Sequence, residues 1–221
     1  MIKGIFVDFY GTIVQEDKEL FREIVSLISK DCKSYTRAEI GSFWGKEHQR
    51  AFNNAYGTKF ETQRVLEKKA LENTINMFHS NANVDELCQM MFERWIRPPI
   101  FDESILFFEN RPVPIYIVSN IDTSDINEAI KYHNLSPDGV FTSEDAKAYK
   151  PRKEPFELAL NVSGLNINEV IHIGDSITCD INGASALGIK SLFINRYNTT
   201  LPTDIVSITD LLEAYRYIDN V

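Results

Sequence analysis

Four short polar segments of this chain carry side chains that can act as nucleophile, proton carrier or metal ligand. In chain order they are 8–12 (Asp-Phe-Tyr-Gly-Thr), 119–120 (Ser-Asn), 150–151 (Lys-Pro) and 174–180, which begins Gly-Asp-Ser and ends in aspartate. A carboxylate can attack phosphorus or carbon, which divides hydrolysis into two steps through a covalent intermediate. Carboxylate oxygens also suit a hard divalent cation, and a lysine adds a point positive charge. These residue types therefore have the chemistry that covalent hydrolysis needs.

Three of these segments follow short apolar runs, which we interpret as buried strands at 2–7, 113–118 and 170–173. A single aspartate at the end of a strand is usually a turn or capping residue. Ligands of open parallel sheets, however, bind outside the carboxyl ends of the strands. Three polar strand ends in one chain therefore favour a shared site.

The remaining elements must bring these strand ends together. Helical spacing alone fills 16–97, where we expect about four helices, one of them opened by a capping box at Thr36 and Glu39. After Pro98-Pro99, strands and helices alternate, which predicts a mostly parallel, doubly wound sheet because parallel neighbours need crossover connections. Further strands are expected at 140–142 and 190–194, and helices at 124–133, at 155–164 and through Ile181, Ala184 and Leu187.

Composition narrows the class of protein. The 221 residues are 43% hydrophobic and 25% charged, as in ordinary globular proteins. A net charge of −9 disfavours a nucleic-acid or anionic membrane partner. Three scattered cysteines suggest neither a disulfide framework nor a zinc cluster, and favour reducing cytoplasm. No 18-residue apolar run and no leader pattern occurs, so we expect neither export nor a membrane span.

In their order and spacing, the four segments resemble the four motifs of the haloacid dehalogenase-like (HAD) hydrolase superfamily, and the resemblance covers the whole chain. It implies an α/β fold in which a Rossmann-like, doubly wound parallel sheet forms the core and an all-helical cap domain is inserted after the first motif. On this basis we assign residues 1–15 and 98–221 to the core domain and 16–97 to the cap domain.

The resemblance also implies a role for each matching residue. Asp8 would be the nucleophile, Ser119 would hydrogen-bond the anionic group of the substrate, and Lys150 would steady both. Asp175 would hold Mg²⁺, with Asp180 as a second acidic residue near the ion. In full, the catalytic candidates are Asp8, Tyr10, Ser119 and Lys150; the substrate-binding candidates are Thr12, Ser119, Asn120 and Lys150; and the metal candidates are Asp8, Tyr10, Asp175 and Asp180.

Tyr10 departs from the phosphatase pattern of the superfamily. Phosphatases usually carry a second aspartate two residues after the nucleophile, which protonates the leaving alcohol and then activates water. A phenol with a reference pKa of about 10 is a poor proton carrier at neutral pH. The Asp-x-Tyr-Gly-Thr form resembles the 2-haloacid dehalogenases, whose halide leaving group needs no proton. Glu16 and Asp17 are the nearest candidates for a replacement carboxylate.

The fourth segment favours the phosphatase instead. Metal-free dehalogenases typically have Ser-Asn where this chain has Gly174-Asp175, and without a cation Asp175 would repel both Asp8 and a haloacid. Those dehalogenases also place a halide-binding arginine early in the cap, just after aromatic residues, where this chain has Gly45. We interpret the nearby Lys46 and Arg50 as part of a solvated helix face.

Other conspicuous residues carry a structural interpretation. The helical spacing of four aromatic residues favours core packing over a pocket wall; they are Trp44, Phe52, Tyr56 and Trp95. His172 falls within a predicted buried strand and is interpreted as a core histidine.

We therefore expect a magnesium-dependent phosphatase of small phosphomonoesters that forms an aspartyl-phosphate on Asp8. The first alternative is a 2-haloacid dehalogenase that forms an aspartyl ester on the same residue. The second is a non-catalytic protein that binds a phosphate ligand. The expected partner is a small-molecule substrate, and the sequence does not define the oligomeric state.

Overall fold

The computed structural model describes residues 1–218, so the last three residues of the predicted core domain lie outside the described part. Within it, six parallel strands form one sheet in the order β3-β2-β1-β4-β5-β6. The chain moves outward from β1 on one side and from β4 on the other, which is the doubly wound arrangement and confirms the predicted fold class. The strands are β1 (Gly4–Val7), β2 (Ile115–Ser119), β3 (Gly139–Thr142), β4 (Val170–Gly174), β5 (Lys190–Ile194) and β6 (Ser207–Ile208).

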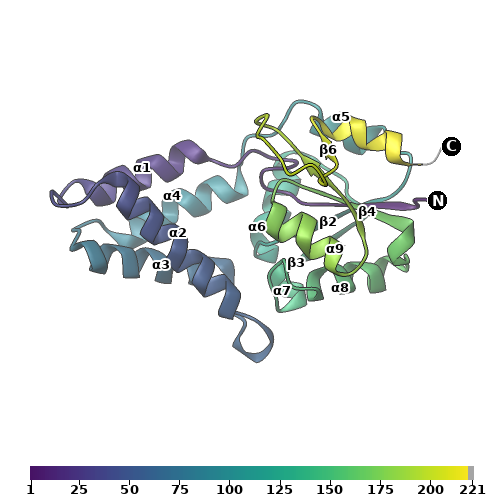
Figure 1. The fold of residues 1–221 in the computed structure, drawn as a ribbon. Coiled ribbons are helices and arrows are strands. Elements are labelled where there is room, and N and C mark those ends of the chain that lie inside the picture. The colour runs from purple at the N-terminus through teal and green to yellow at the C-terminus, as the bar shows by residue number, and fades with distance from the viewer. Residues whose placement is uncertain (219–221) are drawn as a thin grey trace.

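Helices cover both faces of this sheet (Figure 1). Successive residues of a strand point to opposite faces. Accordingly, Ile5 and Val7 pack into an apolar cluster that includes residues of α5, α6 and the last 3-10 helix, whereas Phe6 packs into a second cluster with residues of α8 and α9. These helices are α5 (Ser104–Glu109), α6 (Thr123–Tyr132), α7 (Ser143–Ala146), α8 (Glu154–Ser163), α9 (Gly183–Ala186) and the 3-10 helix Leu211–Tyr217.

Between β1 and α5 the chain forms a separate group of helices that lies beside the sheet (Figure 1). They share an apolar cluster of their own, which contains Ile24, Trp44 and Leu71. The expected capping box of Thr36 and Glu39 opens the second of them. The group consists of α1 (Lys18–Ser29), α2 (Arg37–Asn54), α3 (Gln63–Phe78) and α4 (Val84–Ile96), with a 3-10 turn at Gly57–Lys59. We call it the helical segment.

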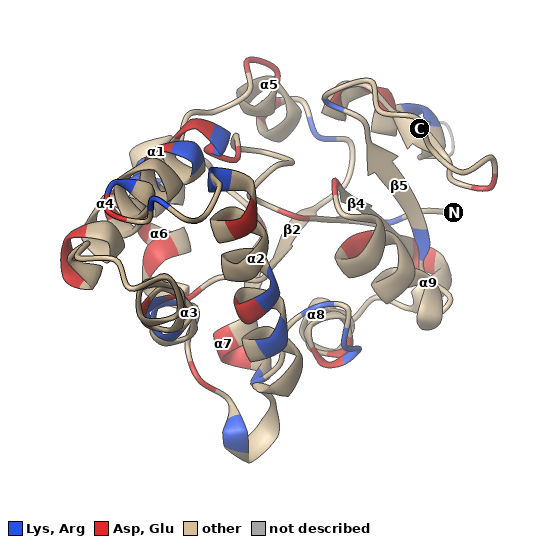
Figure 2. Ribbon diagram, turned by 60° about the vertical axis from the view of Figure 1, so that its left-hand side comes forward, with Lys and Arg blue, Asp and Glu red and all other residues tan. Residues whose placement is uncertain are grey.

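Acidic and basic residues alternate along the helices of this segment rather than forming a patch of one sign (Figure 2). Across residues 1–218, no helix combines the length and the apolar character needed to cross a bilayer.

The helix expected through Ile181 differs from an ordinary α-helix. It begins as a π-helical stretch, Ile177–Asn182, in which the amide of Ile181 donates to the carbonyl of Ser176, five residues earlier, at 3.2 Å. Such widened turns often occur at functional sites. Apolar periodicity cannot reveal this feature, because the change of spacing occupies a single turn. The sequence also did not predict α5, α7, β6 or the last 3-10 helix, which are too short to show a period.

The two chain connections to the helical segment run side by side. Val14 forms an antiparallel bridge with Ile100, and the amide of Gln15 donates to the carbonyl of Pro99 at 2.7 Å. The helical segment therefore leaves the sheet and returns to it at one place.

Candidate active site

Asp8 directly follows β1, at the point where the strand order changes direction. Its amide donates to the carbonyl of Ile173 on β4 at 2.8 Å, which fixes the backbone beside the neighbouring strand. The side chain is largely buried, and this burial raises the pKa of Asp8 against the opposing charge of Lys150. This switch point is where ligands bind in open α/β sheets.

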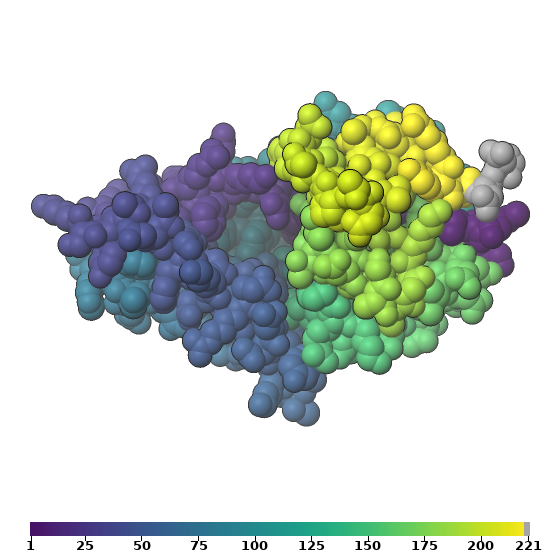
Figure 3. Space-filling view, in the orientation of Figure 1, coloured from purple at the N-terminus to yellow at the C-terminus, as the bar shows by residue number. Residues whose placement is uncertain are grey.

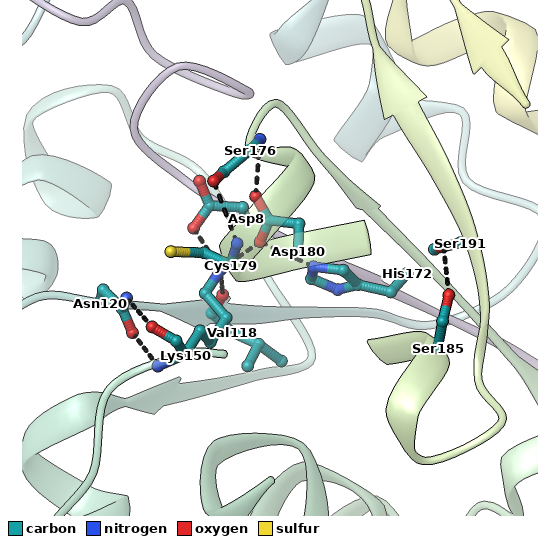
Figure 4. Close-up of polar contacts among 10 residues, drawn as sticks. All are labelled: Asp8, Val118, Asn120, Lys150, His172, Ser176, Cys179, Asp180, Ser185 and Ser191. Carbon is teal, nitrogen blue, oxygen red and sulfur yellow. Dashed lines mark hydrogen bonds and ion pairs between the residues drawn. The ribbon is translucent and has the colours of Figure 1, made fainter. Parts of the chain in front are cut away.

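The ammonium group of Lys150 joins three elements at this edge of the sheet (Figure 4). It donates to Asp8 Oδ1 at 2.8 Å, to Asp180 Oδ1 at 2.6 Å and to the carbonyl of Val118 at 2.8 Å. Burial acts to lower the pKa of Lys150, but the charges of Asp180 and Asp8 outweigh it, so the pKa is raised. The buried lysine therefore remains a cation, with all three of its protons engaged.

Asn120 holds the backbone of Lys150 in place from the side (Figure 4). Its side-chain amide donates to the Lys150 carbonyl at 3.0 Å, and its Oδ1 accepts from the Lys150 amide at 2.7 Å. Both polar ends of the Asn120 side chain are thus used. The structure thus adds a positioning contact for Asn120, which also lines the cavity beside Asp8, so the substrate contact suggested by the sequence stays a prediction.

Asp180 is oriented from both sides of its carboxylate. Oδ1 accepts from His172 Nε2 at 2.9 Å as well as from Lys150, and Oδ2 accepts from the Ser176 amide at 3.0 Å. Burial alone would raise the pKa of Asp180, but the Lys150 charge and the His172 hydrogen bond lower it overall. The fully buried His172, interpreted from sequence as a core residue, therefore also fixes an acidic side chain of the site.

Two glycines make room for the carboxylates of Asp175 and Asp180. A Cβ atom at Gly11 would collide with the Asp175 carboxylate, and one at Gly174 would collide with Asp180. Gly11 also has φ +87°, which favours glycine. Burial, followed by the charges of Asp8 and Asp180, raises the pKa of Asp175 to about 8.

Carboxylate oxygens of Asp8, Asp175 and Asp180 lie within 4.8 Å of one another. When all three are ionised, the one positive charge of Lys150, which contacts Asp8 and Asp180, leaves the group with a net negative charge. Hard oxygen donors at this spacing match the preferences of Mg²⁺. The residues present therefore fit a magnesium ion.

Tyr10 lines the same cavity as this cluster, but its hydroxyl is engaged by the helical segment. Its hydroxyl donates to the carbonyl of Trp95, at the end of α4, at 2.7 Å. Burial and then the charges of Asp125 and Asp8 raise the pKa of Tyr10, so the phenol stays protonated. The side chain expected to act in catalysis or metal binding thus connects the first motif to the helical segment.

Ser119 and Thr12 have different surroundings. Ser119 ends β2, is buried and lines the cavity beside Asp8. Thr12 is fully buried and does not line that cavity, and its carbonyl accepts a hydrogen bond from the guanidinium of Arg196. The structure therefore brings Ser119, but not the Thr12 side chain, to the cavity.

A cavity of about 750 Å³ opens over Asp8, between the sheet and the helical segment, where the surface is hollowed in Figure 3. Three of the four aromatic residues interpreted as core, Trp44, Phe52 and Trp95, also line it, whereas Tyr56 does not. Trp44 is nearly buried, so core packing and cavity lining are combined in one residue.

The helical segment adds a polar group to this cavity that the sequence did not reveal. The buried Glu67 carboxylate accepts from Trp44 Nε1 at 2.7 Å and contacts His48 Nε2 at 3.0 Å, and all three residues line the cavity. No short motif joins these positions, which come from α2 and α3. The only sequence signal is a glutamate within the apolar face of a helix.

Comparison with known proteins identifies similar sequences and folds. A family profile described as haloacid dehalogenase-like hydrolase matches residues 2–188. A curated relative, "Haloacid dehalogenase-like hydrolase domain-containing protein 3" of Danio rerio, is 37% identical over 57 residues. That match covers 26% of this chain and only 24% of the relative's length.

Two solved structures extend the likeness over the whole fold. L-2-haloacid dehalogenase from Xanthobacter autotrophicus, with chloropropionic acid covalently bound, has a TM-score of 0.75 and 16% identity, and the alignment covers 100% of both chains. The putative HAD-hydrolase YfnB from Bacillus subtilis, bound to magnesium, has a TM-score of 0.76 and 19% identity, with 99% of each chain covered. At these identities the likeness concerns the fold alone.

Proposed function

This chain belongs to the haloacid dehalogenase-like hydrolase family, and from that premise we propose that it is a magnesium-dependent phosphatase of small phosphomonoesters. The observation that carries the proposal is the close group of Asp8, Asp175 and Asp180, two of which, Asp8 and Asp180, bind Lys150. A nucleophile surrounded by this much negative charge is poorly suited to an anionic substrate unless a divalent cation is present. A phosphomonoester adds still more negative charge, which such a cation offsets.

In this proposal, Asp8 is the nucleophile and forms an aspartyl-phosphate. Lys150 holds the Asp8 oxygen that it contacts, so the carboxylate meets phosphorus in a fixed orientation. Ser119 binds the phosphoryl oxygens from the end of β2, and Asn120 keeps Lys150 in position.

Asp8 and Asp175 would hold the magnesium ion, and Asp180 would support the site through its contacts to Lys150, His172 and Ser176. When bound, Mg²⁺ supplies charge neutralisation and polarises the transferring group. The helical segment acts as the cap domain, spanning about 16–97, and its side chains enclose the leaving group in the shared cavity.

A 2-haloacid dehalogenase is the second candidate, and Tyr10 is the observation that favours it. Two features weigh against it. Gly45, at the position where the dehalogenases carry their halide-binding arginine, lines the cavity, and an added Cβ there would meet nothing within 4 Å. The nearby Lys46 and Arg50 do not line the cavity.

A paired assay of the purified protein tests the proposal. Phosphate release is measured on a panel of phosphomonoesters with Mg²⁺, and halide release on 2-haloacids in excess chelator. We expect phosphate release that stops when the metal is removed. Halide release at full rate in chelator, without phosphate release, would transfer the assignment to the dehalogenase; neither product would favour a non-catalytic phosphate-binding protein.

A further inference from the structure

When the phosphoryl group of an alkyl phosphomonoester is transferred to Asp8, the departing alkoxide oxygen needs a proton. The Tyr10 phenol occupies the position of the usual acid, but its hydroxyl is engaged with the Trp95 carbonyl, and its pKa is raised. Another titratable side chain of the cavity must therefore serve an alkoxide leaving group.

Glu16 is held at the rim of this cavity by both of its neighbours. The amide of Gln15 donates to the carbonyl of Pro99 at 2.7 Å, which fixes the chain before it. Asp17 caps α1 by accepting from the Leu20 amide at 2.7 Å, which fixes the chain after it. Between these anchors the Glu16 side chain lines the same cavity as Asp8.

The other acidic side chains of the cavity, outside the Asp8 group, are already paired. Asp17 is bound by Arg94 at 2.5 Å, and Glu67 is bound by Trp44 and His48. Among the described residues, the Glu16 carboxylate has neither a hydrogen bond nor an ion pair within contact distance. It is therefore free to exchange a proton with a substrate.

The charged groups that face Glu16 are Asp8 and Asp175 on the sheet side and Lys18 on α1. The side chain has solvent access, yet the surrounding protein still desolvates the carboxyl group. That partial desolvation, followed by the Asp8 charge, raises the pKa of Glu16, while Lys18 opposes the shift. These surroundings favour the protonated form more than water does, as a general acid requires.

We propose that Glu16 is the general acid and base of the phosphatase reaction, in place of the carboxylate that Tyr10 has replaced. As Asp8 attacks phosphorus, the bond from phosphorus to the ester oxygen breaks, and protonated Glu16 gives its proton to that oxygen. The Glu16 carboxylate then takes a proton from water as the water oxygen attacks the aspartyl-phosphate. The Asp8–phosphorus bond breaks, phosphate leaves, and Glu16 is protonated again.

This role of Glu16 rests on the proposed phosphatase activity. Comparing esters with poor and good leaving groups tests the role of Glu16 separately from the phosphatase assignment itself. We would measure kcat/KM for glycerol 2-phosphate and p-nitrophenyl phosphate in the wild type, Glu16→Gln, Glu16→Asp and the matched control Glu19→Gln. Glu19 is an exposed residue of α1 that does not line the cavity. Thermal unfolding confirms that each variant is folded.

Glu16→Gln should lower kcat/KM for the alkyl ester by about 10²-fold or more, the usual worth of a general acid. For the aryl ester, whose leaving group departs without a proton, kcat/KM should change by less than about fivefold. Its kcat should fall, with a burst of nitrophenol, because water attack has lost its base. Glu16→Asp should restore part of the alkyl activity, and Glu19→Gln should resemble the wild type.

Equal losses on both esters in Glu16→Gln, or no loss on either, would overturn the role of Glu16 while leaving the phosphatase assignment intact. A wild type that releases no phosphate from either ester, but releases halide from a 2-haloacid, would overturn both.

Discussion

At the scale of single residues, Tyr10 connects the first motif to the helical segment. Its hydroxyl meets the last turn of α4, where helix carbonyls lack partners within the helix. A carboxylate at this position would be an acceptor facing an acceptor. The hydrogen bond to Trp95 therefore gives Tyr10 a structural role that a carboxylate could not fill.

Two substitutions of Tyr10 test its hydrogen bond to Trp95 separately from its inability to donate a proton to the leaving group. Tyr10→Phe removes one hydrogen bond and leaves the Trp95 carbonyl unpaired, which should lower the free energy of unfolding by about 1–3 kcal/mol. Chemical denaturation of Tyr10→Phe and the wild type measures this difference. An unchanged free energy would show that the contact carries no stability.

Tyr10→Asp should raise turnover on alkyl phosphates relative to aryl phosphates, because it returns a carboxyl group beside the nucleophile. Tyr10→Phe serves as its control, since both lose the contact to Trp95. Steady-state kinetics on the two ester classes check this. A similar fall across every leaving group in both folded variants would assign the phenol hydroxyl a positive role in the reaction, whereas a fall in Tyr10→Asp alone would show that a carboxyl group at this position does not act as the acid.

Asp8→Asn should remove turnover, because an amide is a poor nucleophile in the same shape. Its oxygen can still accept from Lys150, so the fold should persist. Phosphate release, with thermal unfolding as the check on folding, measures this. Activity within tenfold of the wild type would contradict covalent catalysis by Asp8.

The sequence placed Asp8, Lys150, Asp175 and Asp180 correctly beside one another, because their strands and motifs have recognisable order. It could not indicate that Asn120 would face Lys150. Such contacts depend on side-chain directions between loops that are 30 residues apart.

At the scale of elements, Asp122 lies at the start of α6 but caps a different helix, α3. It precedes α6, yet its carboxylate accepts from the amides of Gln63 and Arg64, at 2.6 and 3.0 Å, in the first turn of α3. Arg64 in turn binds Asp125 through two nitrogens. The connection between β2 and α6 thereby caps a helix of the helical segment and fixes its direction.

Asp122→Ala should lower the free energy of unfolding by about 1–2 kcal/mol, the usual worth of a capping side chain. For a chain of this size, that is a loss of roughly 2–8 °C in Tm. Hydrogen exchange should also accelerate in the first turn of α3. Asn83→Ala, which removes the cap of α4, is the matched control and should leave exchange in α3 unchanged. If the amides in the first turn of α3 exchanged no faster in Asp122→Ala than in the wild type, the capping role of Asp122 would be contradicted.

Element prediction succeeded where periodicity extends over several turns, as in α2 and α8, and where an apolar run is bounded by turns, as in β4. The orientation of the helical segment could not be predicted. It is fixed by contacts such as Arg64 with Asp125, which have no signature in local sequence.

At the scale of the whole molecule, an acidic cluster inside an already acidic chain should make stability depend on cations. Mg²⁺ at a concentration 100-fold above its Kd would raise the free energy of unfolding by about 2.7 kcal/mol, if it binds the native state alone. Thermal unfolding with Mg²⁺ and with chelator measures this shift. Asp175→Asn should lose most of it, whereas Asp102→Asn, an exposed control, should retain it. An equal shift in both variants would place the cation elsewhere.

The adjoining chain crossings at Gln15 and Pro99 have a consequence for protein engineering. Because Gln15 and Pro99 already lie within hydrogen-bond distance of each other, a turn of two or three residues could join the chain at these positions without disturbing the register of β1. The four helices between these positions, α1 to α4, could therefore be removed or replaced as one unit. Grafting the corresponding helices of another family member onto this scaffold, with Asp8, Lys150 and Asp175 unchanged, would then test whether these helices determine substrate preference.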